Sequence, residues 1–423
     1  MQLLVKNATI IAPDSPYHEQ TRDILIQKGK ITAIAEQIDE PTAQIIEAEG
    51  LYLSPGWFDT WVQVGDPGFE HREDLDSVVA AGAAGGFTAI TCLPNTQPVI
   101  QSKSQVLYVK NRVHASVVAV HPIGAISEQA AGKDITEIYD MQAAGAVAFS
   151  DGKNALQDGG LLMRSLQYVK KFDGLIINHP FNRSVAAGGQ LHEGEVSTML
   201  GIKGIPSLAE ELMVIRDIYL AEYTQSRLHI ANISTARAVE LIQQAKAKGI
   251  QVTASVAVLN LLHTAQDLLD FDSNLKVSPP LRAASDRAAL IEGVKTGVID
   301  VITSNHVPVE EEGKKLEFAY ATSGAIGLQT AFAALLEVGL DLTTIVRALA
   351  IRPREIFGIE RAEVAVDAPA NLTLFRPKQS WTFTKTHILS KSRNTSLIDR
   401  TFTGGVHGII RADKWVPNPD TTV

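Results

Sequence analysis

The sequence predicts an α/β protein: a parallel (β/α)8 TIM barrel flanked by a small β-sandwich domain built from both ends of the chain. Short apolar runs alternate with longer amphipathic segments through the middle of the chain, and strand-like alternation appears at both ends. The length of 423 residues also exceeds what one ordinary core needs. We therefore expect residues 1–54 and 359–423 to form a discontinuous β domain and residues 55–358 to form the barrel.

The two ends of the chain carry the pattern of β structure. Within residues 2–53, apolar residues alternate in short pieces such as Leu3 with Val5, and turns are indicated at Gly29 and Gly50. This pattern predicts small antiparallel strands. Strand-like segments return after Gly358, at 370–375, 381–383 and 408–410.

The middle of the chain contains eight apolar runs, each ending in a polar residue. Strands buried on both faces read as continuous apolar runs, and their alternation with helices gives a parallel sheet. Eight such units match a (β/α)8 barrel. The runs are 57–64, 88–93, 117–121, 146–149, 175–178, 228–232, 251–256 and 300–304.

Helix-like segments separate these runs. Ser102 and Thr235 are suited to begin helices, and Gly249 and Gly297 to end them. A doubly wound open sheet is the alternative architecture, but no G-x-G-x-x-G follows a strand, so the dinucleotide-binding fingerprint is missing. The predicted helices span 74–84, 102–113, 161–171, 208–223, 235–248 and 287–296.

Composition limits the partners and the compartment. A net charge of -9 argues against nucleic acid or an anionic membrane surface as the main partner. Cys92 is the only cysteine, so no internal disulfide can form, and we expect it to be a core residue. With no run of about 18 apolar residues and no secretion signal at the start, we expect a cytoplasmic protein.

Enzymes with this fold place their chemistry at the carboxyl ends of the barrel strands. The predicted strand ends carry polar residues that we expect to converge on one face of the barrel. The first of them follows the stretch 54–68, where apolar alternation gives way to a Pro/Gly turn. These residues are Gln63, Asn95, His121, Asp151, His179, Asn232, Ser255, Asn305 and His306.

A metal hydrolase needs three or more histidine or carboxylate ligands and a base. Asp151 and His179 supply two ligands. Asn232, Asn305 and Gln63 offer only neutral oxygens, which are poor zinc ligands. The sequence therefore predicts an incomplete metal site, with zinc as the metal if any is retained and no other cofactor.

Several blocks of sequence, in this order and spacing, resemble the type I dihydroorotases of the amidohydrolase superfamily. The resemblance covers nearly the whole chain and implies a metal-dependent (β/α)8 barrel with a flanking β domain. Active members of that family reversibly close carbamoyl aspartate to dihydroorotate in pyrimidine biosynthesis. The blocks are PGWFDTWVQVGDPG, GGFTAITCLPNTQPV, AVAFSDG, LHEGE, GIPSLAEELMVIRDIYLAE, HIANIST, VTASV, SPPLRAASDRAALIEGVKTGVID and ITSNHVPVEE.

The first family motif is lost. The family carries His-x-His-x-Arg after its first strand, which provides two metal ligands and an arginine for the substrate carboxylate. This chain has Trp61, Gln63 and Gly65 at those positions. By resemblance, both ligands and the carboxylate clamp are replaced, and Trp61 is expected to fill the space they leave.

The other family positions are kept only in part. By resemblance, Asp151 stands at the bridging carboxylate, His179 at the next ligand and Asn95 at a substrate contact. A ligand histidine is replaced by Asn232, the general base of the pattern Asp-His-Ala-Pro-His by Asn305 and its last histidine by Val309. An asparagine that contacts substrate is replaced by Ser278. Because an amide has no basic lone pair near neutral pH, Asn305 cannot take up the proton.

These replacements predict a dihydroorotase homologue without catalysis, kept as a structural or regulatory subunit. By resemblance to related systems, we expect aspartate carbamoyltransferase, a homo-oligomer, or both as its assembly partners. The alternative is an active dihydroorotase or other cyclic amidase with a rearranged mononuclear metal site formed by Asp151, His179 and His306.

Overall fold

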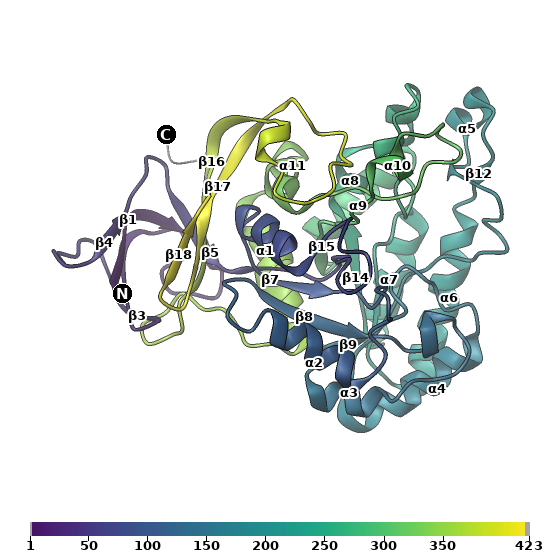
Figure 1. Ribbon diagram of the computed structural model, residues 1–423, viewed down its shortest axis with the longest axis horizontal. Helices are drawn as coiled ribbons and strands as arrows, with labels where there is room; N and C mark the ends of the chain where they lie inside the picture. Colours follow the sequence, from purple (N-terminus) through teal and green to yellow (C-terminus); the bar gives the residue numbers. More distant parts are fainter. Residues whose placement is uncertain (1, 419–423) are drawn as a thin grey trace.

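The computed structural model describes residues 2–418 and contains a barrel beside a flanking sheet (Figure 1). The barrel sheet has eight parallel strands, and the strand order follows the chain order around the barrel. Each of the eight predicted runs overlaps one of these strands, so the predicted barrel is confirmed. The strands are β6 Trp57–Asp59, β7 Phe87–Cys92, β8 Ala119–Gly124, β9 Ala148–Phe149, β10 Ile176–Asn178, β13 Leu228–Ile230, β14 Val252–Ala257 and β15 Val301–Thr303.

The seam between the first and last barrel strands is closed just beyond their ends. Val62 and His306 form a parallel bridge, and the Gln63 N–H donates to the His306 carbonyl at 2.9 Å. Asp59 adds a second tie, since its Oδ2 accepts from the Ser304 N–H at 2.9 Å. The loops that follow β6 and β15 are therefore fixed to each other.

The six predicted helices are present, with small shifts at their ends. Asp74 begins α1 with a capping box, and the Thr235 hydroxyl accepts from the Ala238 N–H to begin α7. Ser102 begins α2 without a side-chain capping bond. The helices are α1 Leu75–Ala84, α2 Lys103–Arg112, α4 Gly159–Val169, α6 Leu208–Thr224, α7 Ala236–Ala247 and α9 Ala284–Lys295.

Several further elements were not predicted. They are short, so that a helical period has too few residues to show in the sequence. They are α3 Ile138–Ala144, α5 Glu195–Leu200, α8 Val258–Leu262, α10 Glu311–Lys314, α11 Ala331–Glu337, α12 Leu342–Val346, α13 Arg352–Phe357 and the strand pair β11 Leu191–His192 and β12 Gly204–Ile205.

The flanking sheet combines strands from both ends of the chain (Figure 1). It is mixed rather than wholly antiparallel as the sequence suggested, because β4 and β5 both run parallel to β1. The segments predicted at 370–375 and 381–383 form one strand, β16. The strands are β1 Gln2–Ile10, β2 Thr21–Gln27, β3 Lys30–Ala35, β4 Gln44–Ile46, β5 Tyr52–Pro55, β16 Asn371–Phe383, β17 Arg400–Arg411 and β18 Lys414–Pro417.

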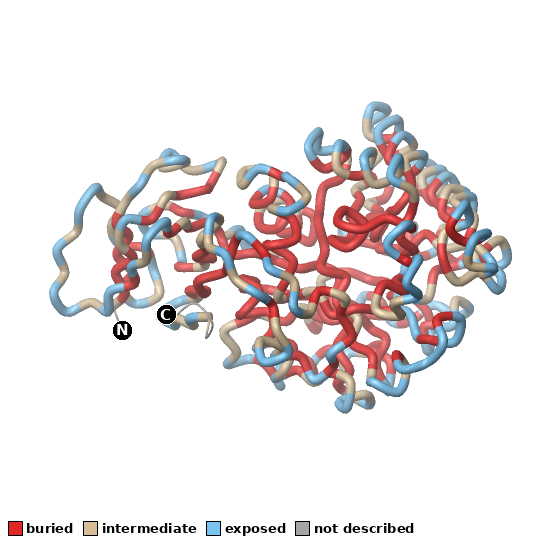
Figure 2. The backbone as a smooth tube through the Cα atoms, turned by 90° about the horizontal axis from the view of Figure 1, so that it is seen from above, coloured by how far each residue is buried: buried red, intermediate tan, exposed pale blue. Residues whose placement is uncertain are grey.

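Burial follows this architecture (Figure 2), with buried backbone concentrated in the barrel and along the sheet next to it. Cys92 is fully buried in β7, and burial raises the pKa of its thiol to about 12, as suits the core residue we expected.

Among residues 2–418, no helix has the length and apolar character needed to cross a membrane.

Trp57 joins the barrel to the flanking sheet. Its ring lies 5.0 Å from the ring of Phe332, 5.6 Å from that of Phe375 and 6.1 Å from that of Phe87, measured between centroids. Its Nε1–H donates to the Ser54 hydroxyl at 3.0 Å. The barrel core and the sheet therefore share one aromatic cluster.

We predict that Trp57→Ala lowers the free energy of unfolding by about 3–5 kcal/mol, because it leaves a large cavity in this cluster. Urea unfolding followed by circular dichroism measures the effect. Tyr320→Ala, at an aromatic residue that is 75% exposed, is the control and should leave the unfolding midpoint nearly unchanged. Equal small effects for both variants would contradict the role assigned to Trp57.

Candidate functional site

The residues expected at the strand ends gather at the barrel mouth, with one exception. The gathered side chains are packed rather than open to solvent, and each of them is at most 8% exposed. Ser278 is exposed at the rim of the same cluster. The buried members are Trp61, Gln63, Asn95, Asp151, His179, Asn232, Asn305 and Val309.

Asp151 follows β9, and its carboxylate is held by a neighbouring loop. Its Oδ1 accepts the N–H groups of Ile126 and Ser127, both at 2.9 Å, and its Oδ2 accepts the Ser127 hydroxyl. Burial raises the pKa of Asp151, while these three bonds act in the opposite direction. Protein donors thus fill three of the roughly four lone-pair positions of the carboxylate.

The Asn95 side chain hydrogen-bonds to the backbone of the loop that carries Asp151. Its Nδ2 donates to the Asp151 carbonyl at 3.0 Å, and its Oδ1 accepts the Lys153 N–H at 3.0 Å. Gly152 lies between these contacts with φ 61°, and a Cβ there would come within 1.9 Å of the Asn95 Oδ1. The side chain expected to contact substrate is therefore engaged within the protein.

His179 lies between aromatic rings. The Phe181 ring is stacked parallel to it with a centroid distance of 6.4 Å, and the Trp61 ring lies at 6.2 Å. Its Nδ1 is 3.3 Å from the Ala231 carbonyl and its Nε2 is 3.4 Å from the Ser278 hydroxyl. Burial lowers the pKa of His179, so the imidazole is neutral.

Asn232 and Asn305 form an amide network across the mouth. The Asn232 Nδ2 donates to the Asn305 Oδ1 at 3.4 Å, and the Thr303 hydroxyl donates to the Asn232 Oδ1 at 2.7 Å. The Asn305 Nδ2 donates to the Ser278 carbonyl at 3.1 Å. Both asparagines have positive φ, 53° and 49°, a conformation that asparagine tolerates.

Both ring nitrogens of His306 are also hydrogen-bonded within the protein. Its Nε2 lies 3.1 Å from the Glu73 Oε2, and its Nδ1 accepts the Gly327 N–H at 3.2 Å. The Nε2 therefore carries the proton and donates to the carboxylate. Glu73 is fully buried and also accepts the hydroxyls of Ser77 and Ser390.

Gly65, at the position of the family's arginine, is enclosed by backbone. Its N–H donates to the Glu73 carbonyl at 3.0 Å. A Cβ on Gly65 would lie 2.2 Å from the Phe69 carbonyl oxygen and 2.5 Å from that of Glu73. No side chain fits there unless the loop moves. The backbone around Gly65 therefore excludes the arginine that would bind the substrate carboxylate.

His121 does not lie at the mouth, contrary to the expectation from sequence. Strand β8 continues to Gly124, which places His121 in mid-strand opposite Thr91. Its ring contacts the Phe58 ring edge-on at 5.6 Å. Burial, with smaller contributions from Arg354 and Arg411, lowers the pKa of His121 to about 4.

The residues present do not fit a catalytic metal. The nitrogen and oxygen atoms of Asp151, His179 and His306 that would bind it already contact protein groups. Within residues 2–418, no group of three or more histidine, cysteine, aspartate or glutamate side chains is arranged to hold a metal ion. Glu73 and Ser127, which engage two of these residues, were not identified from the sequence because they come from loops remote in the chain.

The strand order and flanking sheet define the class of fold: a (β/α)8 barrel beside a flanking β sheet. L-hydantoinase from Arthrobacter aurescens has a TM-score of 0.87 to this chain at 23% identity, over 98% of this chain and 96% of that chain. Dihydropyrimidinase from Brevibacillus agri has a TM-score of 0.83 at 21% identity, over 99% of this chain and 97% of that chain. These likenesses establish the fold.

Sequence comparison identifies the family. The dihydro-orotase-like family matches residues 50–238. Dihydroorotase from Pelotomaculum thermopropionicum is 40% identical over 415 residues, and that from Geotalea daltonii is 38% identical over 410 residues, each over 96% of both chains. The chain therefore belongs to the dihydroorotase family, which confirms the resemblance seen in its sequence.

We predict that Asp151→Ala destabilises the protein by about 2–5 kcal/mol, because it leaves buried donors of Ile126 and Ser127 without an acceptor. Urea unfolding with and without a chelator measures this loss, which should be the same in both conditions. The control, Asp140→Ala, removes an exposed carboxylate of α3 and should have little effect. A chelator that destabilises the wild type as much as the substitution would contradict this role.

His121 should make stability sensitive to acid. It stays neutral in the folded chain down to about pH 4, whereas in the unfolded chain it takes up a proton near pH 6.5. Its contribution is therefore complete above pH 6.5 and is lost as the pH falls to about 4, by up to roughly 3 kcal/mol.

His121→Leu should accordingly flatten the dependence of the unfolding free energy on pH in this window. Urea unfolding at a series of pH values tests it, with exposed His114→Gln as the control. An unchanged slope in His121→Leu would show that His121 does not titrate as its burial implies.

Proposed function

We propose that this member of the dihydroorotase family lacks dihydroorotase activity and serves pyrimidine biosynthesis as a structural or regulatory subunit. The observation that carries the proposal is the engagement of the Asp151 carboxylate by the Ile126 and Ser127 N–H groups and the Ser127 hydroxyl. The family's bridging carboxylate is thereby turned into a structural hydrogen-bond acceptor.

Three chemical requirements of the family reaction have no residue to meet them. The base position is Asn305, whose amide donates to Ser278 and cannot accept a proton. The carboxylate clamp position is Gly65, where a Cβ would meet backbone oxygens. Trp61 packs beside His179, where the family places metal ligands. Each loss alone would cost orders of magnitude in rate.

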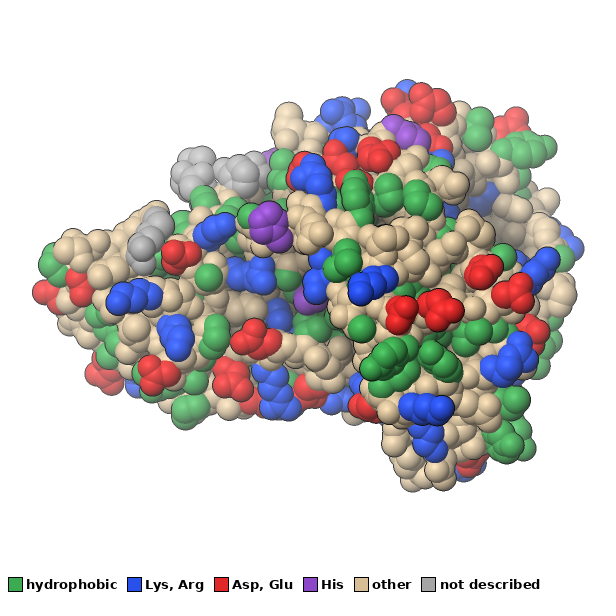
Figure 3. All heavy atoms as spheres, turned by 60° about the horizontal axis from the view of Figure 1, so that its bottom comes forward, with side chains coloured by type: hydrophobic (Ala, Val, Ile, Leu, Met, Phe, Trp, Pro, Cys, Tyr) green, Lys and Arg blue, Asp and Glu red, His purple; other side chains and the backbone are tan. Residues whose placement is uncertain are grey.

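A subunit role requires a surface for a partner, and α6 offers one. Five apolar side chains lie along one face of this helix at intervals of three and four residues, and each is at least 41% exposed. Acidic and basic side chains are interspersed on the face shown in Figure 3, which suits a protein partner better than nucleic acid. The five are Leu208, Leu212, Ile215, Tyr219 and Tyr223.

We propose aspartate carbamoyltransferase as the protein that binds this chain, alongside self-association. We choose this enzyme because related non-catalytic homologues assemble with it. The exposed apolar face of α6 supports contact with a protein in general.

The alternative function is an active dihydroorotase or cyclic amidase. The full-length identity of 40% to a chain named dihydroorotase favours it. It would require Asp151, His179 and His306 to give up their present partners and converge on one metal.

Turnover decides between the two functions. We predict no hydrolysis of dihydroorotate and no closure of carbamoyl aspartate above background, with or without added zinc, because the base, the clamp and the ligands are missing. Dihydroorotate absorbance in the ultraviolet measures both directions, with an active dihydroorotase as the positive control. Zinc-dependent turnover that Asp151→Ala abolishes would refute the proposal.

Assembly has a separate test. We predict that the chain co-elutes with aspartate carbamoyltransferase of the same organism in size-exclusion chromatography. The double variant Leu212→Glu and Ile215→Glu should weaken assembly at least about tenfold, because it puts charge into an apolar contact. The control Lys103→Glu changes a charge on α2. Separate elution of the wild-type chain and the enzyme would remove the support for this partner.

A further inference from the structure

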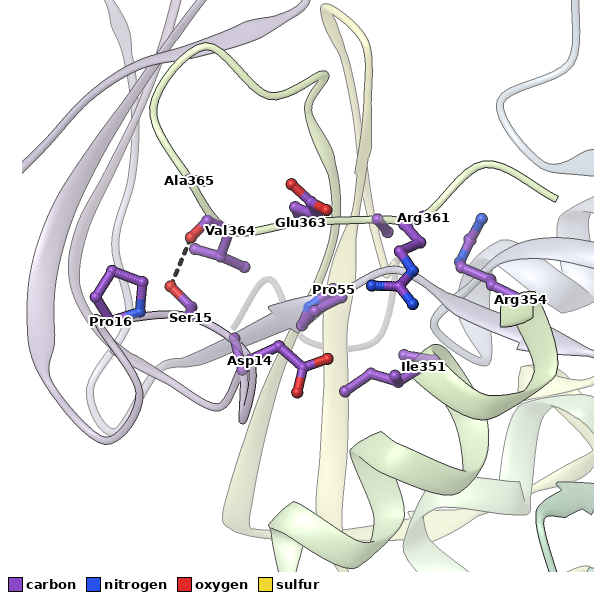
Figure 4. A pocket seen from close by; sticks show the side chains of 13 residues that line it. Asp14, Ser15, Pro16, Pro55, Ile351, Arg354, Arg361, Glu363, Val364 and Ala365 are labelled. Carbon is purple, nitrogen blue, oxygen red and sulfur yellow. Dashed lines mark hydrogen bonds between the residues drawn. The ribbon is translucent and has the colours of Figure 1, made fainter. Parts of the chain in front are cut away.

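A pocket of about 210 Å³ lies between the flanking sheet and the barrel, on the side away from the barrel mouth. The loop between β1 and β2 forms one wall, and the chain around α13 and the segment after it form the other. Figure 4 shows Asp14 and Arg361 extending toward the same space from these two walls. Apolar residues also line it, among them Ala12, Pro55, Ala350 and Val364.

Arg354 lines this pocket and is only 4% exposed. Its Nη2 donates to the Gly56 carbonyl and the Thr88 hydroxyl, both at 3.1 Å, and its Nε to the Gly56 carbonyl at 3.3 Å. Its Nη1 donates to the Glu360 carbonyl at 3.1 Å. A guanidinium has five N–H groups, so one N–H on Nη1 has no acceptor among the described residues.

All of these acceptors are neutral. No carboxylate in residues 2–418 forms an ion pair with Arg354, although the charge of Glu360 attracts it from beyond ion-pair distance, and burial lowers the pKa of its guanidinium to about 10. A buried charge without a directly paired carboxylate is costly, so a small anion in the pocket would relieve it. Arg361, paired with Glu355 at 3.0 Å, adds a second positive charge to the pocket wall.

The outer wall has the opposite charge. Asp14 and Glu363 both line the pocket and are exposed to solvent. The pocket thus has a buried cation at depth and carboxylates at its rim. A simple anion would meet repulsion from the rim, whereas a ligand with a carboxylate at one end and an ammonium at the other would satisfy both.

The pocket volume also limits the size of the ligand. At about 210 Å³ it lies below the roughly 300 Å³ at which pockets for drug-sized ligands begin. We propose that this pocket binds a small α-amino acid, with its carboxylate toward Arg354 and Arg361 and its ammonium toward Asp14 and Glu363. Such a ligand would bridge the flanking sheet and the barrel.

Ligand-observed saturation-transfer NMR with the full chain tests the proposal, with glycine and L-alanine as the probes and acetate and methylammonium as half-ligands. Both amino acids should bind saturably, acetate at least about tenfold more weakly, and methylammonium without saturation. Absence of saturable amino-acid binding to the wild-type chain would overturn the proposal. Equal affinities for glycine and acetate would also overturn it.

Two rim variants separate ligand contact from stability. Asp14→Asn should reduce glycine affinity about tenfold and raise acetate affinity, because it removes a carboxylate that repels the anion, whereas Arg361→Gln should weaken both probes. The buried Arg354→Met should abolish binding, and circular dichroism shows whether that variant folds. If it does not fold, the rim variants decide: unchanged glycine affinity in both would overturn the proposal. Binding here is independent of catalysis at the mouth, so this test and the turnover test fail separately.

Discussion

The structure of the barrel mouth depends on the contact between the Asp151 carboxylate and the loop at Ile126 and Ser127. The two N–H groups and the hydroxyl bind both carboxylate oxygens, which stabilises a buried charge that would otherwise be costly. The same contact fixes the loop after β9 and, through the Asp151 carbonyl, orients Asn95. The Asp151 residue therefore holds two loops of the barrel mouth together.

The remaining polar groups of the barrel mouth are likewise hydrogen-bonded to other groups of the protein. His306 is bound to Glu73, and Asn305 to Asn232 and the Ser278 carbonyl. A satisfied buried network of this kind stiffens its surroundings, and each partner removed leaves an unsatisfied group behind. Opening the network for a metal would require several such bonds to break together. The replacements at Trp61 and Gly65 belong to this arrangement, since one adds packing beside His179 and the other permits the close approach of the Phe69 carbonyl.

The barrel was predictable from sequence because its strands are buried on both faces. Each of the eight apolar runs overlaps a strand, and Asp74 and Thr235 begin helices at or next to the predicted positions. The short helices and the parallel pairing of β4 and β5 with β1 were not predictable, since local pattern carries no information about which distant strand pairs with which. His121 was misplaced because its apolar run continues as strand beyond it, to Gly124.

The candidate site was only partly predictable. The positions at the mouth were found because polar residues end apolar runs, and the resemblance supplied their expected roles. The contacts of Ser127 and Glu73 were not foreseeable, because each lies on a loop whose position depends on the finished fold. The buried Arg354 likewise reads in sequence as an ordinary helix residue of α13.

Zinc content tests the central claim most directly. The chain purified without chelator, dialysed against zinc and analysed by inductively coupled plasma mass spectrometry should hold well under one equivalent, and Asp151→Asn should hold the same amount as the wild type. One or two equivalents of zinc per chain, lost in Asp151→Asn, would contradict the account that the metal site has become part of the protein's own hydrogen-bond network.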